Sequence, residues 1–184
     1  MEKISSVLSI EDEDDKDWAI LQLIQESGPE DPVEQLEALA EQIVNPYDKT
    51  QAYIELFNRC KAKDLPRAHR YLETAREHSV QSCEFWQPAD SLSRIGSLYA
   101  ELGNINRAIS IWNEAVASAE DSIKADPRQD AISCFGILGE IAIKFSEVKM
   151  PERALEIARL IKIDKIRDYA IEKTKNAGQA RDIE

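Results

Sequence analysis

The sequence predicts an all-α protein built of antiparallel helix pairs, with about nine helices. Alanine, leucine, isoleucine and glutamate dominate its 184 residues and only six are glycine, a composition that favours helices. No segment alternates between apolar and polar residues for long enough to predict a strand. The seven prolines all lie at boundaries between segments of helical periodicity.

The individual helices follow from these boundaries. Three prolines directly follow an aspartate or asparagine, a pair that caps a helix and begins its first turn: Pro32, Pro46 and Pro127. Three glycines fall just past predicted helix ends, where a left-handed residue closes the last turn: Gly28, Gly103 and Gly178. Helices are therefore expected at residues 15–28, 32–44, 46–62, 65–79, 88–102, 105–124, 127–147, 151–162 and 164–177.

Short loops make successive helices antiparallel neighbours. The expected pairs are residues 15–44, 46–79, 88–124 and 127–162, and a closing helix follows at 164–177. Together they form one domain over residues 15–178. An acidic N-terminal tail at 1–14 and a C-terminal tail at 179–184 flank this domain.

The helix pairs repeat an internal pattern. When they are aligned on Ala68, Ala108 and Ala154, which lie 40 and 46 residues apart, small residues recur where the two helices of a pair would cross. Larger apolar residues recur where neighbouring pairs would meet. A repeat of this length is typical of helical solenoids.

The 88–124 pair matches a known repeat. Leu92, Ile95, Gly96, Tyr99, Gly103, Ala108, Trp112 and Ala115 together resemble the tetratricopeptide repeat signature. The resemblance covers about residues 46–162 and implies a right-handed superhelix of α-helix pairs. It also implies that Gly96 and Ala108 form the contact between the two helices and that Gly103 makes the turn. Lys149 stands where a later pair would have its turn glycine, and Arg59 stands in the aromatic place of an earlier pair. The repeat spacings exceed the ~34 residues of the family, which predicts a less regular superhelix.

The charge and the cysteines limit the partners and the compartment. A net charge of −12 repels phosphate backbones, so we expect no nucleic-acid binding, and a basic protein partner fits better. No apolar run approaches the roughly 20 residues of a membrane span, so we expect no membrane contact. Cys60, Cys83 and Cys134 are an odd number without close spacing, which favours reduced thiols and a cytoplasmic location. A secretion signal without hydrophobic character is left open.

No combination of residues predicts catalysis. His69 and Glu73 are one helical turn apart, but the sequence supplies no third strong metal ligand beside them. His78 and Cys83 are a base and a nucleophile in type, yet nothing near them predicts an oxyanion hole. No phosphate-binding glycine loop is present either. We therefore expect no enzyme, no cofactor and no metal site.

Residues 11–17, with the sequence EDEDDKD, form an acidic run directly before Trp18. One interpretation is a solvated lead-in whose carboxylates stabilise the positive end of the first helix. The other interpretation is an acidic tail that docks on a basic partner.

The leading helix of the 46–79 pair provides the first candidate partner-binding residues. Tyr53, Phe57 and Cys60 form a second apolar stripe, offset by about 100° from the residues that contact the paired helix. This stripe must face either the neighbouring pair at residues 15–44 or a ligand.

Further candidates lie around the start of the 88–124 pair. Phe85 and Trp86 either staple the chain into the next helix or form an exposed aromatic anchor for a partner. Ser93, Ser97 and Glu101 occupy the equivalent groove positions of this pair, so the groove there is expected to be small-sided and polar.

These observations predict a non-catalytic protein–protein interaction module, an adaptor or scaffold that binds a peptide or helix of a partner. The resemblance implies that the groove is lined by the first helix of each pair. A dedicated chaperone for a secreted or assembly-prone protein is one alternative, and a homo-oligomeric structural protein is another. The identity of the partner does not follow from the sequence.

Overall fold

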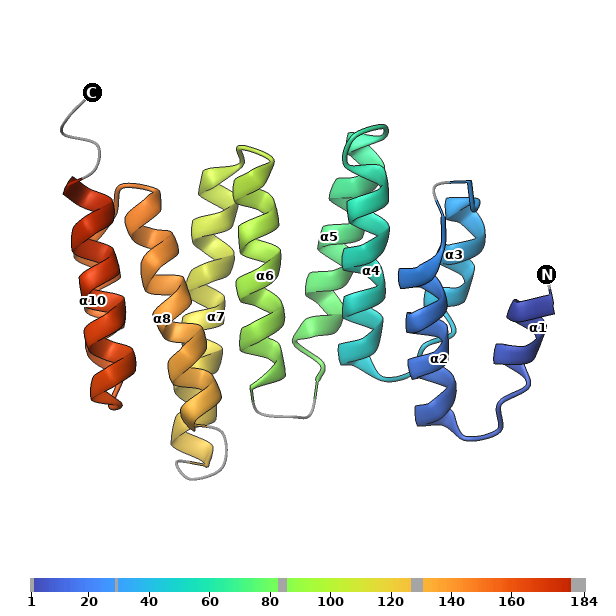
Figure 1. The fold of residues 1–184 in the computed structure, drawn as a ribbon, viewed down its shortest axis with the longest axis horizontal. Coiled ribbons are helices and arrows are strands. Elements are labelled where there is room, and N and C mark those ends of the chain that lie inside the picture. Colours follow the sequence, from blue (N-terminus) through green and yellow to red (C-terminus); the bar gives the residue numbers. More distant parts are fainter. Residues whose placement is uncertain (1, 29, 83–85, 127–130, 180–184) are drawn as a thin grey trace. The chain divides into compact units, whose positions relative to one another are not determined.

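The computed structural model describes residues 2–28, 30–82, 86–126 and 131–179 (Figure 1). These residues form α-helices and no strand, which confirms the all-α class. The described helices are α1 (Glu2–Leu8), α2 (Glu13–Glu26), α3 (Val33–Ala40), α4 (Pro46–Cys60), α5 (Leu65–Ser79), α6 (Gln87–Glu101), α7 (Ile105–Ala125), α8 (Ala131–Glu147), α9 (Pro151–Leu160) and α10 (Asp164–Gln179). The chain divides into two compact units, residues 1–83 and 84–184. A continuous right-handed superhelix over residues 15–178 stays a prediction.

In unit 1, residues 1–83, α4 is the central helix. It forms a hairpin with α5 and packs against both α2 and α3, while α1 lies against α2. The apolar side chains between these helices are buried: Ile20, Ile24, Leu36, Leu39, Ile43, Ile54, Leu56 and Leu72. The pair expected at residues 15–44 is therefore present as α2 and α3, and it supports the hairpin that follows.

The N-terminus differs from the tail expected at residues 1–14. α1 covers Glu2–Leu8, and α2 already begins at Glu13. Asp12 caps α2, because its side chain accepts a hydrogen bond from the backbone N–H of Asp15 at 3.0 Å. The acidic run thus stabilises the start of a helix, as the first of its two interpretations predicts.

A side chain of α2 fixes the segment that follows α3. α3 ends at Ala40, four residues before the expected end at 44. Asp17 of α2 is buried, and its Oδ2 accepts hydrogen bonds from the backbone N–H groups of Val44 and Asn45, at 2.9 and 2.6 Å. Asn45 then caps α4, which begins at Pro46 as predicted. One buried carboxylate therefore fixes the connection between α3 and α4 onto α2.

Arg59 of α4 occupies the place where the resemblance implies an aromatic residue. Its guanidinium donates hydrogen bonds to the carbonyl oxygens of Ile24, Ser27 and Gly28, at 3.1 Å for Ile24 and 2.9 Å for Gly28. Carbonyls at the end of a helix lack partners within that helix, so they need donors from elsewhere. Arg59 provides these donors and ties α4 to the end of α2.

In unit 2, residues 84–184, two hairpins and a closing helix follow one another. α6 pairs with α7 and α8 pairs with α9. α8 also packs against α6 and α7, and α10 packs against α8 and α9. Figure 1 shows α6, α8 and α10 in this order. Each of α8 and α10 thus contacts both helices of the preceding pair, an arrangement typical of stacked helical repeats.

Trp112 of α7 is the centre of the first hairpin in unit 2. Its indole is buried, and Nε1 donates a hydrogen bond to the carbonyl oxygen of Ser93 at 3.2 Å. A Cβ atom at Gly96 would lie 2.5 Å from both Cδ1 and Nε1 of this indole, so a side chain there would displace it. The ring of Phe145 meets the indole edge-on at 5.6 Å, which extends the packing to α8. The close approach predicted at Gly96 is present, but the side chain nearest to it is Trp112 rather than Ala108.

The two hairpin turns of unit 2 share one backbone geometry. Gly103 has a φ of 76° and Lys149 a φ of 64°, both in the left-handed region. In each turn the following residue donates its N–H to the carbonyl five residues earlier, at 2.9 Å. This pattern closes a helix in the manner predicted for Gly103. A lysine adopts the same conformation at 149.

We expect Lys149→Gly to raise the free energy of unfolding of unit 2 by about 1 kcal/mol, because the left-handed conformation strains a residue that has a Cβ atom. Lys149→Ala is the matched control, since it removes the charge and keeps the Cβ atom. Urea unfolding followed by circular dichroism measures both variants. Equal stability of the glycine and alanine variants would contradict the strain.

α10 closes unit 2 against α8. A Cβ atom at Gly139 would lie 3.4 Å from Ile166 of α10, and the hydroxyl of Ser146 donates to the carbonyl oxygen of Thr174 at 2.9 Å. α10 continues to Gln179, so the expectation that a glycine at 178 lies past the helix end is wrong. The tail residues 180–184 and the expected start of a helix at 127–130 lie outside the described residues.

Candidate protein-interaction site

The stripe of Tyr53, Phe57 and Cys60 is part of the core of unit 1. These side chains are 2%, 0% and 4% exposed. The hydroxyl of Tyr53 donates a hydrogen bond to Glu41, and its ring lies 5.9 Å from the ring of Tyr71. The stripe therefore packs inside the unit, and its interpretation as an open ligand surface is wrong. Glu41 lies in residues 15–44, so for Tyr53 the packing alternative is confirmed.

Two buried tyrosine hydroxyls bind carboxylates in and just after α3. Tyr53 donates to Glu41, and Tyr71 donates to Glu37 at 2.7 Å. Burial and then these hydrogen bonds raise the pKa of both hydroxyls. Both tyrosines therefore stay protonated around neutral pH and act as donors that join α3 to α4 and α5.

The remaining sequence candidates do not form one surface. Phe85 lies outside the described residues, and Trp86 is half-buried directly before α6. On α6, Ser93 is buried, Ser97 is half-buried and Glu101 is exposed. The carbonyl oxygen of Ser93 accepts hydrogen bonds from the indole of α7 and from the hydroxyl of Ser97, at 3.2 and 3.1 Å. The two serines thus belong to the interior of the hairpin rather than to a polar groove.

The two histidines, His69 and His78, both interact with other groups. His69 and Glu73 are half-buried on α5, and each takes part in other interactions. His78 stacks on Tyr53 at 5.9 Å, and burial followed by the charge of Lys49 lowers its pKa. Across the described residues, no group of three or more histidine, cysteine, aspartate or glutamate side chains is arranged to hold a metal ion.

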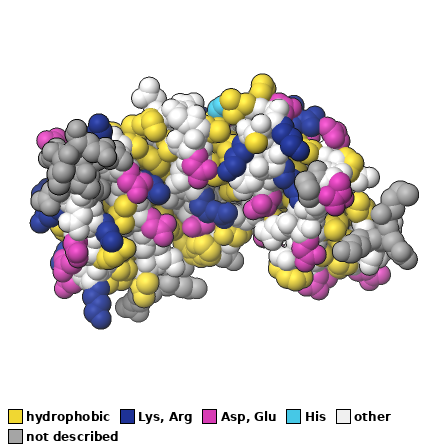
Figure 2. Space-filling model, turned by 45° about the horizontal axis from the view of Figure 1, so that its top comes forward, with side chains coloured by type: hydrophobic (Ala, Val, Ile, Leu, Met, Phe, Trp, Pro, Cys, Tyr) yellow, Lys and Arg dark blue, Asp and Glu magenta, His cyan; other side chains and the backbone are white. Residues whose placement is uncertain are grey.

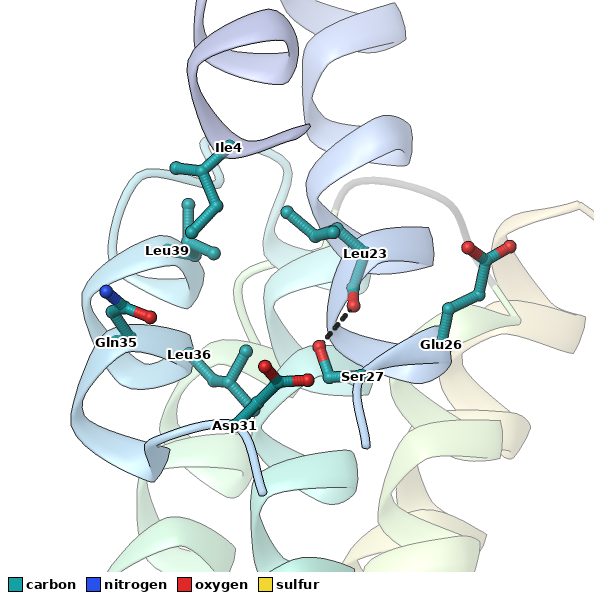
Figure 3. A pocket seen from close by; sticks show the side chains of 8 residues that line it. All are labelled: Ile4, Leu23, Glu26, Ser27, Asp31, Gln35, Leu36 and Leu39. Atoms are coloured by element: carbon teal, nitrogen blue, oxygen red, sulfur yellow. Dashed lines mark hydrogen bonds between the residues drawn. The ribbon is translucent and has the colours of Figure 1, made fainter. Parts of the chain in front are cut away.

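An open groove lies between α1 and α2 of unit 1, and we name it the Trp18 groove. It holds about 530 Å³, which is within the range of sites that bind ligands. Its lining consists of Ser6 and Val7 of α1 and of Trp18, Ala19, Gln22, Leu23 and Glu26 of α2. A neighbouring cavity between α1, α2 and α3 shares two of these residues and is lined by Ile4, Leu23, Glu26, Ser27, Asp31, Gln35, Leu36 and Leu39 (Figure 3).

α1 covers the apolar surface of α2 and α3 only in part. Its apolar side chains Ile4, Val7 and Leu8 are all half-buried, and so is Leu23 of α2. Figure 3 shows Ile4 above Leu39 on one side of the cavity, with Leu23 on the other side. Apolar atoms therefore remain accessible on both α1 and α2.

Trp18 is the most conspicuous residue of this surface. Its side chain is 62% exposed, because it lies on the opposite face of α2 from Ile20 and Ile24, which are buried. Single exposed apolar residues are ordinary, and Ile132 and Tyr169 of unit 2 are exposed to a similar degree. Trp18 differs because it borders a groove with further apolar side chains, a combination that marks binding surfaces.

The surface around α2 is also acidic. Figure 2 shows acidic and hydrophobic side chains beside one another at the end of unit 1 that carries α1 and α2. This charge affects the pKa of Asp48 in the first turn of α4. Burial, and then the charges of Asp17 and Asp14, raise its pKa.

We expect Asp48→Asn to stabilise unit 1 at neutral pH. A raised pKa in the folded state means that the folded protein binds more protons than the unfolded chain just above the ordinary aspartate value of about 3.9. Stability is therefore lost as the pH rises through the folded pKa, and the gain from the asparagine should vanish at pH 3. Urea unfolding of the wild-type chain and of Asp48→Asn between pH 3 and 7 measures this difference in stability. A stability difference that does not change with pH would contradict this origin.

Comparisons with models of protein families, with curated proteins and with solved structures find no match to this chain. Within the described residues, every helix is too short or too polar to cross a membrane.

The residues of the Trp18 groove are not among the binding residues that the sequence predicts. One signal was present, since Trp18 directly follows the acidic run and that run had a docking interpretation. Val7 gave no comparable signal, because α1 is too short to show helical periodicity.

Proposed function

We propose that the protein is a non-catalytic interaction module and that unit 1 binds a segment of a partner protein in the Trp18 groove. The observation that carries this proposal is the exposed indole of Trp18 beside the accessible apolar side chains of Val7 and Leu23. Tryptophan is enriched among the residues that contribute most to binding energy in protein interfaces.

The packing of the helices supports a binding role. Paired helices that stack on their neighbours present long surfaces with fixed side chains, as helical-repeat proteins do when they bind partners. Several polar groups inside unit 1 have structural partners. The carboxylate of Asp17 accepts hydrogen bonds from backbone N–H groups, and the guanidinium of Arg59 donates to backbone carbonyls. The hydroxyls of Tyr53 and Tyr71 donate to carboxylates.

The thiols support a cytoplasmic location. Cys60 of unit 1 and Cys134 of unit 2 are both buried and unbridged. Buried reduced thiols fit a cytoplasmic protein.

The experiment is affinity capture of partners from the native lysate by the full chain, with Trp18→Ala as the test variant. Tyr169→Ala is the matched control, because Tyr169 is a similarly exposed aromatic residue on α10. We expect a partner that the wild-type chain and the control retain and that Trp18→Ala loses by about tenfold, which corresponds to a loss of about 1.4 kcal/mol. Retention of the same partners by Trp18→Ala would overturn the proposed site.

A further inference from the structure

Almost all of the net charge of the chain lies in its first 45 residues. Residues 1–45 contain 13 acidic and 2 basic side chains, a net charge of −11 out of −12. The remaining 139 residues contain 22 acidic and 21 basic side chains and are nearly neutral. Within this segment, α2 forms one wall of the Trp18 groove and carries five acidic residues against one basic residue.

Carboxylates border the groove at both ends of its α2 wall. Asp14 and Asp15 lie one helical turn before Trp18, and Glu26 lies one turn after Gln22. All three carboxylates are exposed. None of them forms an ion pair with a described residue.

The acidic side chains of α3 are in a different situation. Glu34 pairs with Arg67 at 2.6 Å, and Glu37 pairs with Arg70 at 3.3 Å. The basic side chains of α5 are therefore directed at α3. Of the segments that carry excess negative charge, α2 is the one that lines the groove.

The size of the groove limits its occupant. Residues 18–26 of α2 span about 12 Å, since an α-helix rises 1.5 Å per residue. The apolar part of the groove lining consists of Trp18, Ala19 and Leu23 on α2 and Val7 on α1. A helix of about two to three turns that carries one apolar stripe between basic side chains matches both the length and the pattern.

We propose that the Trp18 groove binds a basic amphipathic helix of a partner protein. The apolar stripe of this helix packs on Trp18 and Leu23, and its lysine or arginine side chains pair with Asp14, Asp15 and Glu26. This inference rests on the proposed function and specifies the chemistry of the partner. Opposite charges steer the encounter and fix the orientation of the helix, while the apolar contacts supply most of the affinity.

The probe is a fluorescein-labelled peptide of 14 residues that consists of leucine and lysine. The leucines are spaced three and four residues apart, so they form one face of a helix, and the lysines form the other face. A scrambled peptide of the same composition separates amphipathic binding from simple attraction to an acidic protein. Fluorescence anisotropy with the full chain measures affinity at low and at moderate salt. We expect the amphipathic peptide to bind at least about tenfold more tightly than the scrambled peptide.

Substitutions in the groove separate the apolar contribution to peptide binding from the electrostatic one. Trp18→Ala should weaken binding of the amphipathic peptide about tenfold at both salt concentrations. Asp14→Asn with Asp15→Asn should weaken it mainly at low salt and reduce the salt dependence. The matched control is Glu140→Gln with Glu172→Gln, two exposed carboxylates of unit 2, and it should bind as the wild-type chain does.

Three outcomes of the peptide experiment would overturn the inference. These are equal binding of the scrambled peptide, equal weakening by the control variant, and binding that Trp18→Ala leaves unchanged. Dimerisation that light scattering detects and Trp18→Ala abolishes would assign the groove to a second copy of the chain and also overturn it. A partner that is lost from the lysate capture with Trp18→Ala, combined with a peptide that does not bind, would leave the proposed function standing and remove only the basic helix.

Discussion

Replacement of Asp17 by alanine is expected to lower the free energy of unfolding of unit 1 by about 3 kcal/mol. The side chain is 1% exposed, and its Oδ2 accepts the backbone N–H groups of Val44 and Asn45 at 2.9 and 2.6 Å. These two hydrogen bonds are part-buried, and a hydrogen bond to a charged acceptor contributes about 1.5–3 kcal/mol. The loss also frees the connection that leads into α4.

Urea unfolding measures this effect, and hydrogen exchange locates it. Amide exchange in residues 41–49 should become faster in Asp17→Ala, because two of the amides there lose their acceptor. Asp17→Asn keeps one side-chain oxygen as an acceptor and should lose only about 1 kcal/mol. Asp15→Ala, at an exposed position of the same helix, controls for the change in charge. Equal losses in Asp17→Ala and Asp15→Ala would show that the buried hydrogen bonds are not the cause.

Gly96→Ala is expected to lower the free energy of unfolding of unit 2 by about 1–2 kcal/mol. The new Cβ atom would lie 2.5 Å from two atoms of the Trp112 indole, which is buried and hydrogen-bonded to Ser93. Overpacking of this kind costs about 1–3 kcal/mol. It opposes the roughly 0.5–1 kcal/mol by which alanine is favoured over glycine in a helix.

A double-mutant cycle with Trp112→Leu tests the contact directly. In that background the rigid indole is absent, so Gly96→Ala should stabilise the unit through helix propensity alone. The sign of the alanine effect therefore reverses between the two backgrounds. The same loss in both backgrounds would mean that the Cβ atom meets something other than Trp112.

Much of the fold of each unit could be predicted, because the relevant signals are local. The hairpin turn at Gly103 and the cap at Asn45 depend on residues within one helical turn. The cap predicted before Pro32 is absent, because the side chain of Asp31 accepts a hydrogen bond from the backbone N–H of Gly28 instead. Lys149 could also be recognised as a departure from the repeat, and its positive φ shows that the backbone keeps the turn without glycine.

Long-range packing could not be predicted in the same way. Periodicity showed that the stripe containing Tyr53 and Phe57 is apolar, but it did not show that α2 and α3 cover α4. Asp17 stands in a run that composition describes as solvated, and its burial depends on backbone groups 27 and 28 residues away. Arg59 similarly finds its acceptors more than 30 residues away.

The candidate site shows the same limit. The acidic run could be recognised in the sequence, and so could its two interpretations. Which side of α2 stays open depends on how far α1 covers it, and the half-buried side chains of Ile4 and Val7 are a property of the packing. The accessible indole of Trp18 follows from that packing rather than from any motif.

The distribution of buried thiols allows the two units to be followed separately. Cys60 reports on unit 1 and Cys134 on unit 2, and neither side chain is more than 4% exposed. Burial also raises the pKa of the Cys60 thiol, which keeps it in the unreactive protonated form. An alkylating reagent such as N-ethylmaleimide would therefore modify each cysteine only when its own unit opens. Timed quenching and peptide mass spectrometry would then give two independent opening rates from a single unmodified sample.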